Sequence, residues 1–273
     1  GKKVWSIDCD ARLQELGKDR LRRPMPGPHR PQIEFITGEF GPAIKGYPST
    51  HLHHRPWQDY FTPQSIALGL HTCGSLSYYL MDYFLKGQGH ALINIGCCYN
   101  KLETSSHHHL SAIAQQHPLN FTFEAMTLAS RAHRKMSFAD FSTKDQVKKY
   151  RYTLHLLFFY EYGLTEFFPV GENNLKDYKK PFAEYAQDKI KKFQLPARTN
   201  EFLEHFFLDQ KIKTLVRRMF LSNILRWQFG PVLEAHLLAD RALSLAANGA
   251  QAHLGELFEV ERSPRNIVLW ATK

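Results

Sequence analysis

The stretch that decides the fold is IALGLHTCGSLSYYLMDYFLKGQGHALINIGCCYNKL, residues 66–102. It is built around two short aliphatic runs, residues 65–71 and 91–96, each with the composition of a buried β-strand. Between them, residues 75–85 have the apolar spacing of a helix, and Ser75 is a suitable N-cap. A strand, a helix and a second strand in this order predict a parallel pair joined by a crossover.

The amino-terminal part continues the same alternation. Residues 2–8 form an apolar run that ends in Asp8, residues 11–23 have helical composition, and residues 33–37 form another short apolar run. A loop rich in Gly, Pro and His follows over residues 38–63. Strands that alternate with helices predict an α/β fold with a mostly parallel sheet that helices cover on both faces.

The middle of the chain changes to helix, and the end returns to sheet. Helical periodicity runs through residues 144–162, 181–193, 200–208, 210–227 and 231–247. Residues 254–260 and 266–272 predict a closing hairpin with an antiparallel edge strand. We therefore expect a core over residues 1–109, a helical insertion on the substrate side over 110–250, and a hairpin over 251–273 that completes the core sheet.

Composition places the chain among ordinary globular proteins. With 273 residues, 43% of them hydrophobic and 22% charged, it can bury a sizeable core, which excludes a disordered, collagen-like or disulfide-built protein. Its four cysteines are too few and too unevenly spaced to cross-link a chain of this length, which favours a reducing compartment. No apolar run approaches the roughly 20 residues of a membrane span. We therefore expect a soluble, cytoplasmic protein that does not bind membranes.

The charge balance favours a polyanionic partner. Lys and Arg number 35 against 26 Asp and Glu, so the formal net charge is +9. Basic residues gather in four helical stretches at 144–151, 176–180, 188–192 and 211–218, and the first two also contain a tyrosine. Such stretches can bind phosphate while aromatic rings stack on bases. Each alone is more often a solvated helix face, so only their convergence on one side would indicate RNA.

Four chemically capable side chains fall at the carboxyl ends of the predicted strands, namely Asp8, Thr37, His71 and Cys97. In parallel sheets, ligands bind beyond these ends. Asp8 can accept hydrogen bonds from ribose hydroxyls, or Asp8 or Asp10 can cap the helix that follows. A histidine can act as a general base at neutral pH, which is one role for His71, or its side chain can hydrogen-bond a loop carbonyl.

The cysteines and histidines near these ends allow several interpretations. Thiolate and imidazole suit zinc, and a conceivable ligand set consists of His71, Cys73, Cys97 and Cys98. Adjacent strand residues point to opposite faces, so Cys97 and Cys98 can share an ion only if the chain turns there, and we therefore expect no metal. A catalytic thiol and small buried side chains are the alternatives. The histidine run at 107–109 is interpreted as a solvated surface.

Several segments together resemble one known family. The resemblance to the methyltransferase-like protein 25 family, which includes the ribosomal RNA adenine dimethylase domain-containing proteins, rests on LHTCGSLS (70–77), IGCCYNKL (95–102), GPVLEAHLLADRALSL (230–245) and SPRNIVLWATK (263–273). A similar pairing of His-x-Cys-Gly and Cys-Cys occurs in tRNA 2′-O-methyltransferases that act on the acceptor stem. The resemblance therefore implies a methyltransferase whose substrate is RNA.

The resemblance also implies a Rossmann-like fold, S-adenosylmethionine as the cofactor, and roles for particular residues. Asp8, with Cys9 beside it, would hold the ribose hydroxyls, and residues 36–38 would border the adenine. Residues 71–74 would lie under the methionine and methyl end, while residues 97–99 would line the substrate side. The implied cofactor-binding residues are thus Asp8, Cys9, Ile36, Thr37, Gly38, His71, Thr72, Cys73 and Gly74, and the implied catalytic residues are His71, Cys97, Cys98 and Tyr99.

The chain departs from the family pattern in two ways. Ser75 stands where the family commonly has Asp directly after Cys-Gly. The first strand of the fold and its Gly-rich loop are not in the sequence, so we expect an amino-terminally truncated chain. An inactive methyltransferase-like binding module is therefore an alternative function, and so is a methyltransferase that acts on a protein or a small molecule.

Overall fold

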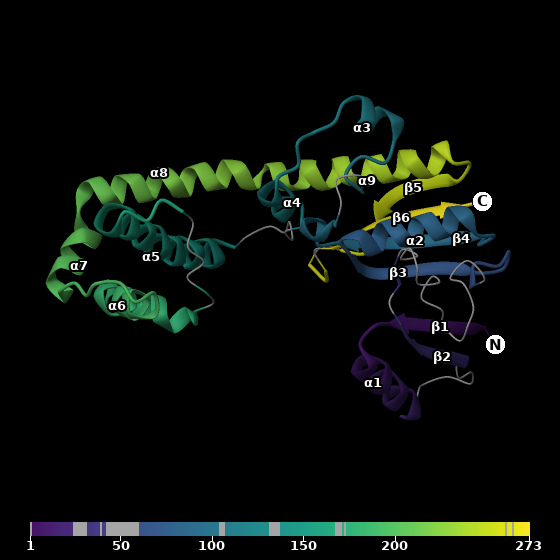
Figure 1. Ribbon diagram of the computed structural model, residues 1–273, viewed down its shortest axis with the longest axis horizontal. Helices are drawn as coiled ribbons and strands as arrows, with labels where there is room; N and C mark the ends of the chain where they lie inside the picture. The colour runs from purple at the N-terminus through teal and green to yellow at the C-terminus, as the bar shows by residue number, and fades with distance from the viewer. Residues whose placement is uncertain are drawn as a thin grey trace. The chain divides into compact units, whose positions relative to one another are not determined.

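The computed structural model describes residues 2–23, 32–38, 40–41, 60–103, 107–130, 137–166, 171, 173–259, 261–263 and 265–273, so most of the predicted loop at 38–63 lies outside the described residues. The chain forms two compact units (Figure 1). The sheet unit consists of residues 1–134 together with 229–273, and the helical unit consists of residues 135–228. Among the helices of the described part, none is long and apolar enough to cross a membrane.

The strands of the sheet unit form two sheets. β1 (Lys3–Asp8) pairs in parallel with β2 (Gln32–Thr37). The second sheet has the order β3-β4-β6-β5, with bounds Ile66–Cys73, Ala91–Cys97, Ile267–Thr272 and Gln251–Glu256. β3 and β4 are parallel, whereas β5 and β6 form the predicted antiparallel hairpin and β6 is also antiparallel to β4. The prediction of one mostly parallel sheet is wrong, because no strand among the described residues joins β1 to β3.

The sheet unit also contains helices and a 3-10 turn. They are α1 (Ala11–Arg22), α2 (Ser75–Lys86), the 3-10 turn η2 (Tyr99–Lys101), α3 (Ala112–Gln116), α4 (Phe123–Ala129) and α9 (Phe229–Ala247). α1 begins where the Asp10 side chain accepts a hydrogen bond from the Arg12 N–H. α2 begins after Gly74. The prediction that Ser75 caps α2 is wrong, because Ser75 is already the first helical residue and its hydroxyl bonds elsewhere.

The core of the sheet unit lies between α2 and the strands. Its buried side chains include Ile36, Tyr79, Tyr83, Phe84 and Leu92. Side chains alternate along a strand, and the other face of β3 carries Ile66, Leu68 and Leu70, which are 61%, 59% and 62% exposed. The prediction that helices cover both faces of the sheet is therefore wrong at β3.

The helical unit consists of α5 (Phe138–Tyr162), the 3-10 turn η4 (Leu175–Lys179), α6 (Phe182–Lys192), α7 (Asn200–Leu208) and α8 (Gln210–Trp227). The predicted bounds of α7 and α8 are confirmed, whereas α5 begins at Phe138, earlier than predicted, because Ser137 caps it. The unit is shorter than the insertion expected over 110–250, because α3, α4 and α9 belong to the sheet unit. There, α4 and α9 share a buried cluster with Tyr99.

Candidate functional site

A bulge in β3 sets the position of the first cysteine. His71 has a φ of +55°, which is uncommon for residues other than glycine, and the register of β3 against β4 slips by one residue there. As a result, Cys73 lies opposite Cys97, whereas an unbroken ladder would place it opposite Cys98. The carboxyl ends of the two parallel strands therefore bring two thiols together.

A turn at Cys98 adds a third thiol to this pair. The left-handed conformation of Cys98, with a φ of +44° and a ψ of +51°, takes the chain out of the strand direction directly after Cys97. The sulfur atoms of Cys73, Cys97 and Cys98 all lie within 4.8 Å of one another, and those of Cys73 and Cys97 are 3.0 Å apart. The turn that Cys97 and Cys98 need in order to share a ligand is thus present. His71 has an exposed side chain and does not belong to this group.

Gly74 and Thr72 hold the end of β3 in place. A Cβ at Gly74 would lie 2.2 Å from the Lys101 carbonyl oxygen, so only glycine allows the loop after β4 to approach this closely. The Gly74 N–H donates to the Cys97 carbonyl at 3.3 Å. Thr72 is 3% exposed, and its hydroxyl donates to Asn94 Oδ1 at 2.5 Å. Both residues are implied in cofactor binding, and in the structure both connect β3 to β4.

Ser75 is joined to a histidine far along the chain. Its hydroxyl shares a hydrogen bond of 2.9 Å with His107 Nδ1 and accepts another of 2.9 Å from the Glu103 N–H. The His107 ring stacks on Tyr78 with 3.9 Å between centroids, and it is 7% exposed. Burial lowers the pKa of His107, which favours the neutral ring. The interpretation of 107–109 as a solvated surface is therefore wrong for His107, and no local sequence signal marks this contact.

Tyr99, implied on the substrate side, lies in the interior. It is 2% exposed, and its hydroxyl donates to Glu234 Oε1 at 3.4 Å. Burial raises the pKa of Glu234 to about 6. The guanidinium of Arg241, itself 1% exposed, lies 5.6 Å from the Tyr99 ring centroid, and its Nε and Nη2 atoms have no hydrogen-bond partner among the described residues. Sequence reasoning missed Glu234 and Arg241 because they come from α9, far along the chain.

Asp8 lies at the carboxyl end of β1, where one of its two carboxylate oxygens accepts a hydrogen bond. Its Oδ1 accepts from the Asp10 N–H at 2.8 Å, and its backbone carbonyl accepts from the Gly38 N–H at 3.0 Å. Thr37 lies opposite Asp8 in the parallel ladder. Asp10, not Asp8, caps α1. Among the described residues, Asp8 Oδ2 has no hydrogen-bond partner, and the neighbouring Cys9 is an exposed free thiol.

A hollow of about 290 Å³ lies beside Asp8, at the lower limit of small-molecule sites. Residues of β1, α1 and β2 line it, and no residue of β3 or β4 is among them. Ile36, implied near the adenine, is 1% exposed, and its carbonyl accepts from Gln14 Nε2 at 2.9 Å. The structure thus gathers Asp8, Thr37 and Gly38 at one strand end and the cysteines at another.

Residues 3–105 match the family model of a methyltransferase domain. The match begins at β1 and ends after η2, so it contains Asp8, the β3 bulge and the three clustered thiols. No solved structure matches the chain. The match supports a methyltransferase activity, and methyltransferase domains generally use S-adenosylmethionine.

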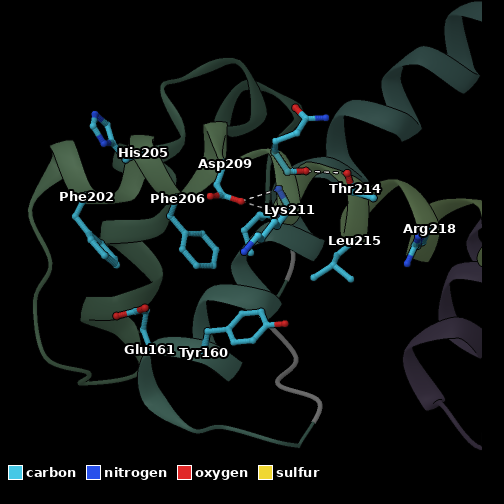
Figure 2. Close-up of a pocket in the computed structure, with 12 residues that line it drawn as sticks. Tyr160, Glu161, Phe202, His205, Phe206, Asp209, Lys211, Thr214, Leu215 and Arg218 are labelled. Carbon is cyan, nitrogen blue, oxygen red and sulfur yellow. Dashed lines mark hydrogen bonds between the residues drawn. The ribbon is translucent and has the colours of Figure 1, made fainter.

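The residues that match a methyltransferase domain do not include the helical unit, which has a groove of its own. The groove has a volume of about 910 Å³ and is lined by the end of α5 and by α7 and α8 (Figure 2). Figure 2 shows Asp209 at the start of α8, where its carboxylate accepts from the backbone N–H groups of Lys211 and Ile212. None of the residues implied by the family resemblance lines this groove. Its mixed charges, Glu161 and Asp209 beside Lys211 and Arg218, favour no single ligand class.

Proposed function

We propose that this protein is an S-adenosylmethionine-dependent methyltransferase that acts on RNA. The observation that carries the proposal is the match of residues 3–105 to a methyltransferase domain, together with the half-free carboxylate at the end of β1. The narrower resemblance to the methyltransferase-like protein 25 family stays a prediction, and so does a cytoplasmic location.

The fit of the cofactor can be tested against the end of β1. A ribose diol needs acceptor oxygens, and Asp8 Oδ2, which has no hydrogen-bond partner in the described part of the chain, is such an acceptor. The backbone of Thr37 and Gly38 lies beside Asp8, because Thr37 pairs with Asp8 in the ladder and the Gly38 N–H donates a hydrogen bond to the Asp8 carbonyl. The carboxylate at this strand end therefore fits the ribose of a nucleoside cofactor. When bound, S-adenosylmethionine supplies an electrophilic methyl group on a sulfonium.

His71 is the candidate for moving a proton. Its imidazole is exposed at the carboxyl end of β3 and has no hydrogen-bond partner among the described residues. A free imidazole at this edge can take a proton from an acceptor hydroxyl or amine as that group attacks. The bulge that gives His71 its positive φ also turns it out of the ladder, which supports this role.

The division of the sheet bears on how the cofactor site is completed. Within the described residues, β1 pairs only with β2, and β3 pairs only with β4, so each has one unpaired edge. A further parallel strand between β1 and β3 would join the two sheets. The turn after such a strand is where a Gly-rich loop approaches a nucleotide.

The proposal of an RNA substrate rests on the charge of the helical unit. Residues 135–228 contain 17 Lys and Arg against 11 Asp and Glu, so they hold six of the nine net positive charges. The pKa of Lys189 is lowered by burial and then by the positive charges of Lys192 and Arg151. The basic stretches at 144–151 and 188–192 therefore lie near each other, and such a surface attracts phosphates.

Calorimetric titration with S-adenosylhomocysteine tests the cofactor proposal. We expect the protein to bind this ligand, and we expect Asp8→Asn to weaken binding about 10- to 100-fold, because a hydrogen bond to a charged group is lost. Asp19→Asn on α1 removes the same charge from an exposed ion pair and should leave binding unchanged. Absence of heat at millimolar ligand would refute the proposal.

Fluorescence anisotropy with a labelled RNA oligonucleotide tests the substrate proposal. Lys191 and Lys192 are exposed on α6, and reversing both charges, Lys191→Glu and Lys192→Glu, should lower the affinity and reduce the salt dependence by about one to two phosphate contacts. Arg22→Glu with Arg23→Glu in the sheet unit is the matched control. Equal losses in both pairs would indicate only general charge attraction.

A binding module without activity is the second candidate, and Ser75 favours it. Ser75 stands where the family commonly has Asp. It is 2% exposed, and its hydroxyl is hydrogen-bonded to His107 Nδ1 and to the Glu103 N–H. Transfer of a radiolabelled methyl group to any fraction of a cell extract would exclude this candidate. Label that survives ribonuclease but not protease would assign the acceptor to protein, and label that survives both treatments would assign it to a small molecule.

A further inference from the structure

We propose that Cys73, Cys97 and Cys98 form a binding site for a zinc ion. The three thiolates are the protein ligands, and the fourth tetrahedral position is open to water or to an external ligand. The test of this site does not use S-adenosylmethionine, so its outcome is separate from that of the test of the proposed methyl transfer.

The geometry of the sulfur atoms fits one ion. Zinc binds thiolates at about 2.3 Å, which places two sulfurs of a tetrahedral site about 3.8 Å apart. Here all three sulfurs lie within 4.8 Å of one another, and the shortest separation, between Cys73 and Cys97, is 3.0 Å. Shifts of less than about 1 Å at each side chain would therefore complete the site.

The backbone around the cluster adopts unusual conformations that bring the sulfurs together. Among the described residues, the positive φ values outside glycine occur at His71, Cys98 and Gln194. Of these, Cys98 belongs to the cluster and His71 lies two residues before Cys73. The bulge at His71 moves Cys73 opposite Cys97, and the left-handed turn brings Cys98 to the same side. Strained residues of this kind gather where a ligand or a reaction uses them.

The charges near the cluster suit a metal thiolate. The positive charges of Arg265 and Lys101 act on the Cys98 sulfur. A bound metal ion deprotonates its thiol ligands. Zinc with three thiolates carries one net negative charge, which Lys101 and Arg265 offset.

Cobalt titration of the reduced, metal-free full chain tests the proposal. The chain has 15 histidines that can also bind cobalt, so the readout is the near-ultraviolet charge-transfer absorption that only a sulfur ligand produces. We expect saturation at one sulfur-bound cobalt ion per chain, displaced by zinc. Reduced protein without this absorption would overturn the proposal, whether or not the chain binds S-adenosylhomocysteine.

Matched variants assign the absorption to the cluster. Cys98→Ser changes a partly exposed side chain and should weaken sulfur-bound cobalt by at least about tenfold. Cys9→Ser alters the exposed cysteine outside the cluster and should have no effect, and His71→Ala should likewise retain the absorption. Unchanged binding in Cys98→Ser would overturn the site. An intact mass showing that Cys73 and Cys97 form a disulfide under reducing conditions would also overturn it.

Discussion

At the scale of single residues, Gly74 combines a positive φ with a close backbone approach. We expect Gly74→Ala to lower the free energy of unfolding by about 2–4 kcal/mol, because the new Cβ would meet the Lys101 carbonyl. Gly249→Ala is the control in the same unit: its φ is +86°, nothing lies within 4 Å, and about 1 kcal/mol is expected. Urea unfolding measures both. Equal losses would mean that the approach to Lys101 costs nothing.

Glu234 should make the sheet unit sensitive to pH. Burial raises its pKa to about 6 in the folded chain, against 4.5 for an unperturbed glutamate side chain. The folded state therefore binds the proton more tightly, and the stability from Glu234 is lost as pH rises from about 4.5 to about 6. Glu234→Gln stays neutral, so it should be more stable than the wild type at pH 7, by at most about 2 kcal/mol before solvent screening.

Denaturant unfolding at several pH values measures the effect of Glu234→Gln. The difference from the wild type should disappear towards pH 4.5. Glu256→Gln, on the exposed edge strand β5, is the control and should show no such dependence. A Glu234→Gln difference that stays constant with pH would contradict the assignment to the buried carboxyl.

At the scale of elements, α8 depends on its first cap. The Asp209 carboxylate accepts from the Lys211 N–H at 2.7 Å and from the Ile212 N–H at 3.0 Å. Asp209→Ala should therefore lower the stability of the helical unit by about 1 kcal/mol, while Asp209→Ser should recover most of the loss because serine also caps helices. Thermal unfolding followed by circular dichroism compares them. Identical losses in the two variants would show that capping is not the cause.

The same local chemistry explains which elements the sequence predicts well. α7 and α8 begin at Thr199 and Asp209, whose side chains accept from the first backbone N–H groups, so their starts are marked in the sequence. β5 was predicted at 254–260 but lies at Gln251–Glu256. An edge strand has little apolar pattern of its own, and its register is set by pairing with β6.

At the scale of the whole molecule, the helical unit has its own core. Residues 135–228 bury Leu154, Leu157, Phe158, Tyr185, Ile190 and Leu203 in one cluster. We expect this segment alone to fold with helical circular dichroism and cooperative thermal unfolding. Leu203→Asp, at a position with no exposed surface, should abolish that transition. A broad, non-cooperative transition in the unchanged segment would contradict an independent core.

The sequence by itself determined the features that depend on neighbouring residues. These include the strand ends at Asp8 and Cys97, the starts of the capped helices α1, α7 and α8, and the closing hairpin. It also carries the motifs by which residues 3–105 match a methyltransferase domain. Each of these follows from hydrogen bonds and apolar spacing over a few residues, so composition and order are enough to predict them.

Only the tertiary structure decided the features that join distant parts of the chain. Ser75 is hydrogen-bonded to His107, which lies 32 residues away in the sequence, and the Tyr99 hydroxyl is hydrogen-bonded to Glu234, which lies 135 residues away. Likewise, the meeting of Cys73 with Cys97 depends on a one-residue slip between two strands, and the division of the sheet depends on which edges find partners. Local sequence cannot predict these contacts, because their free energy comes from packing and pairing that exist only in the folded chain.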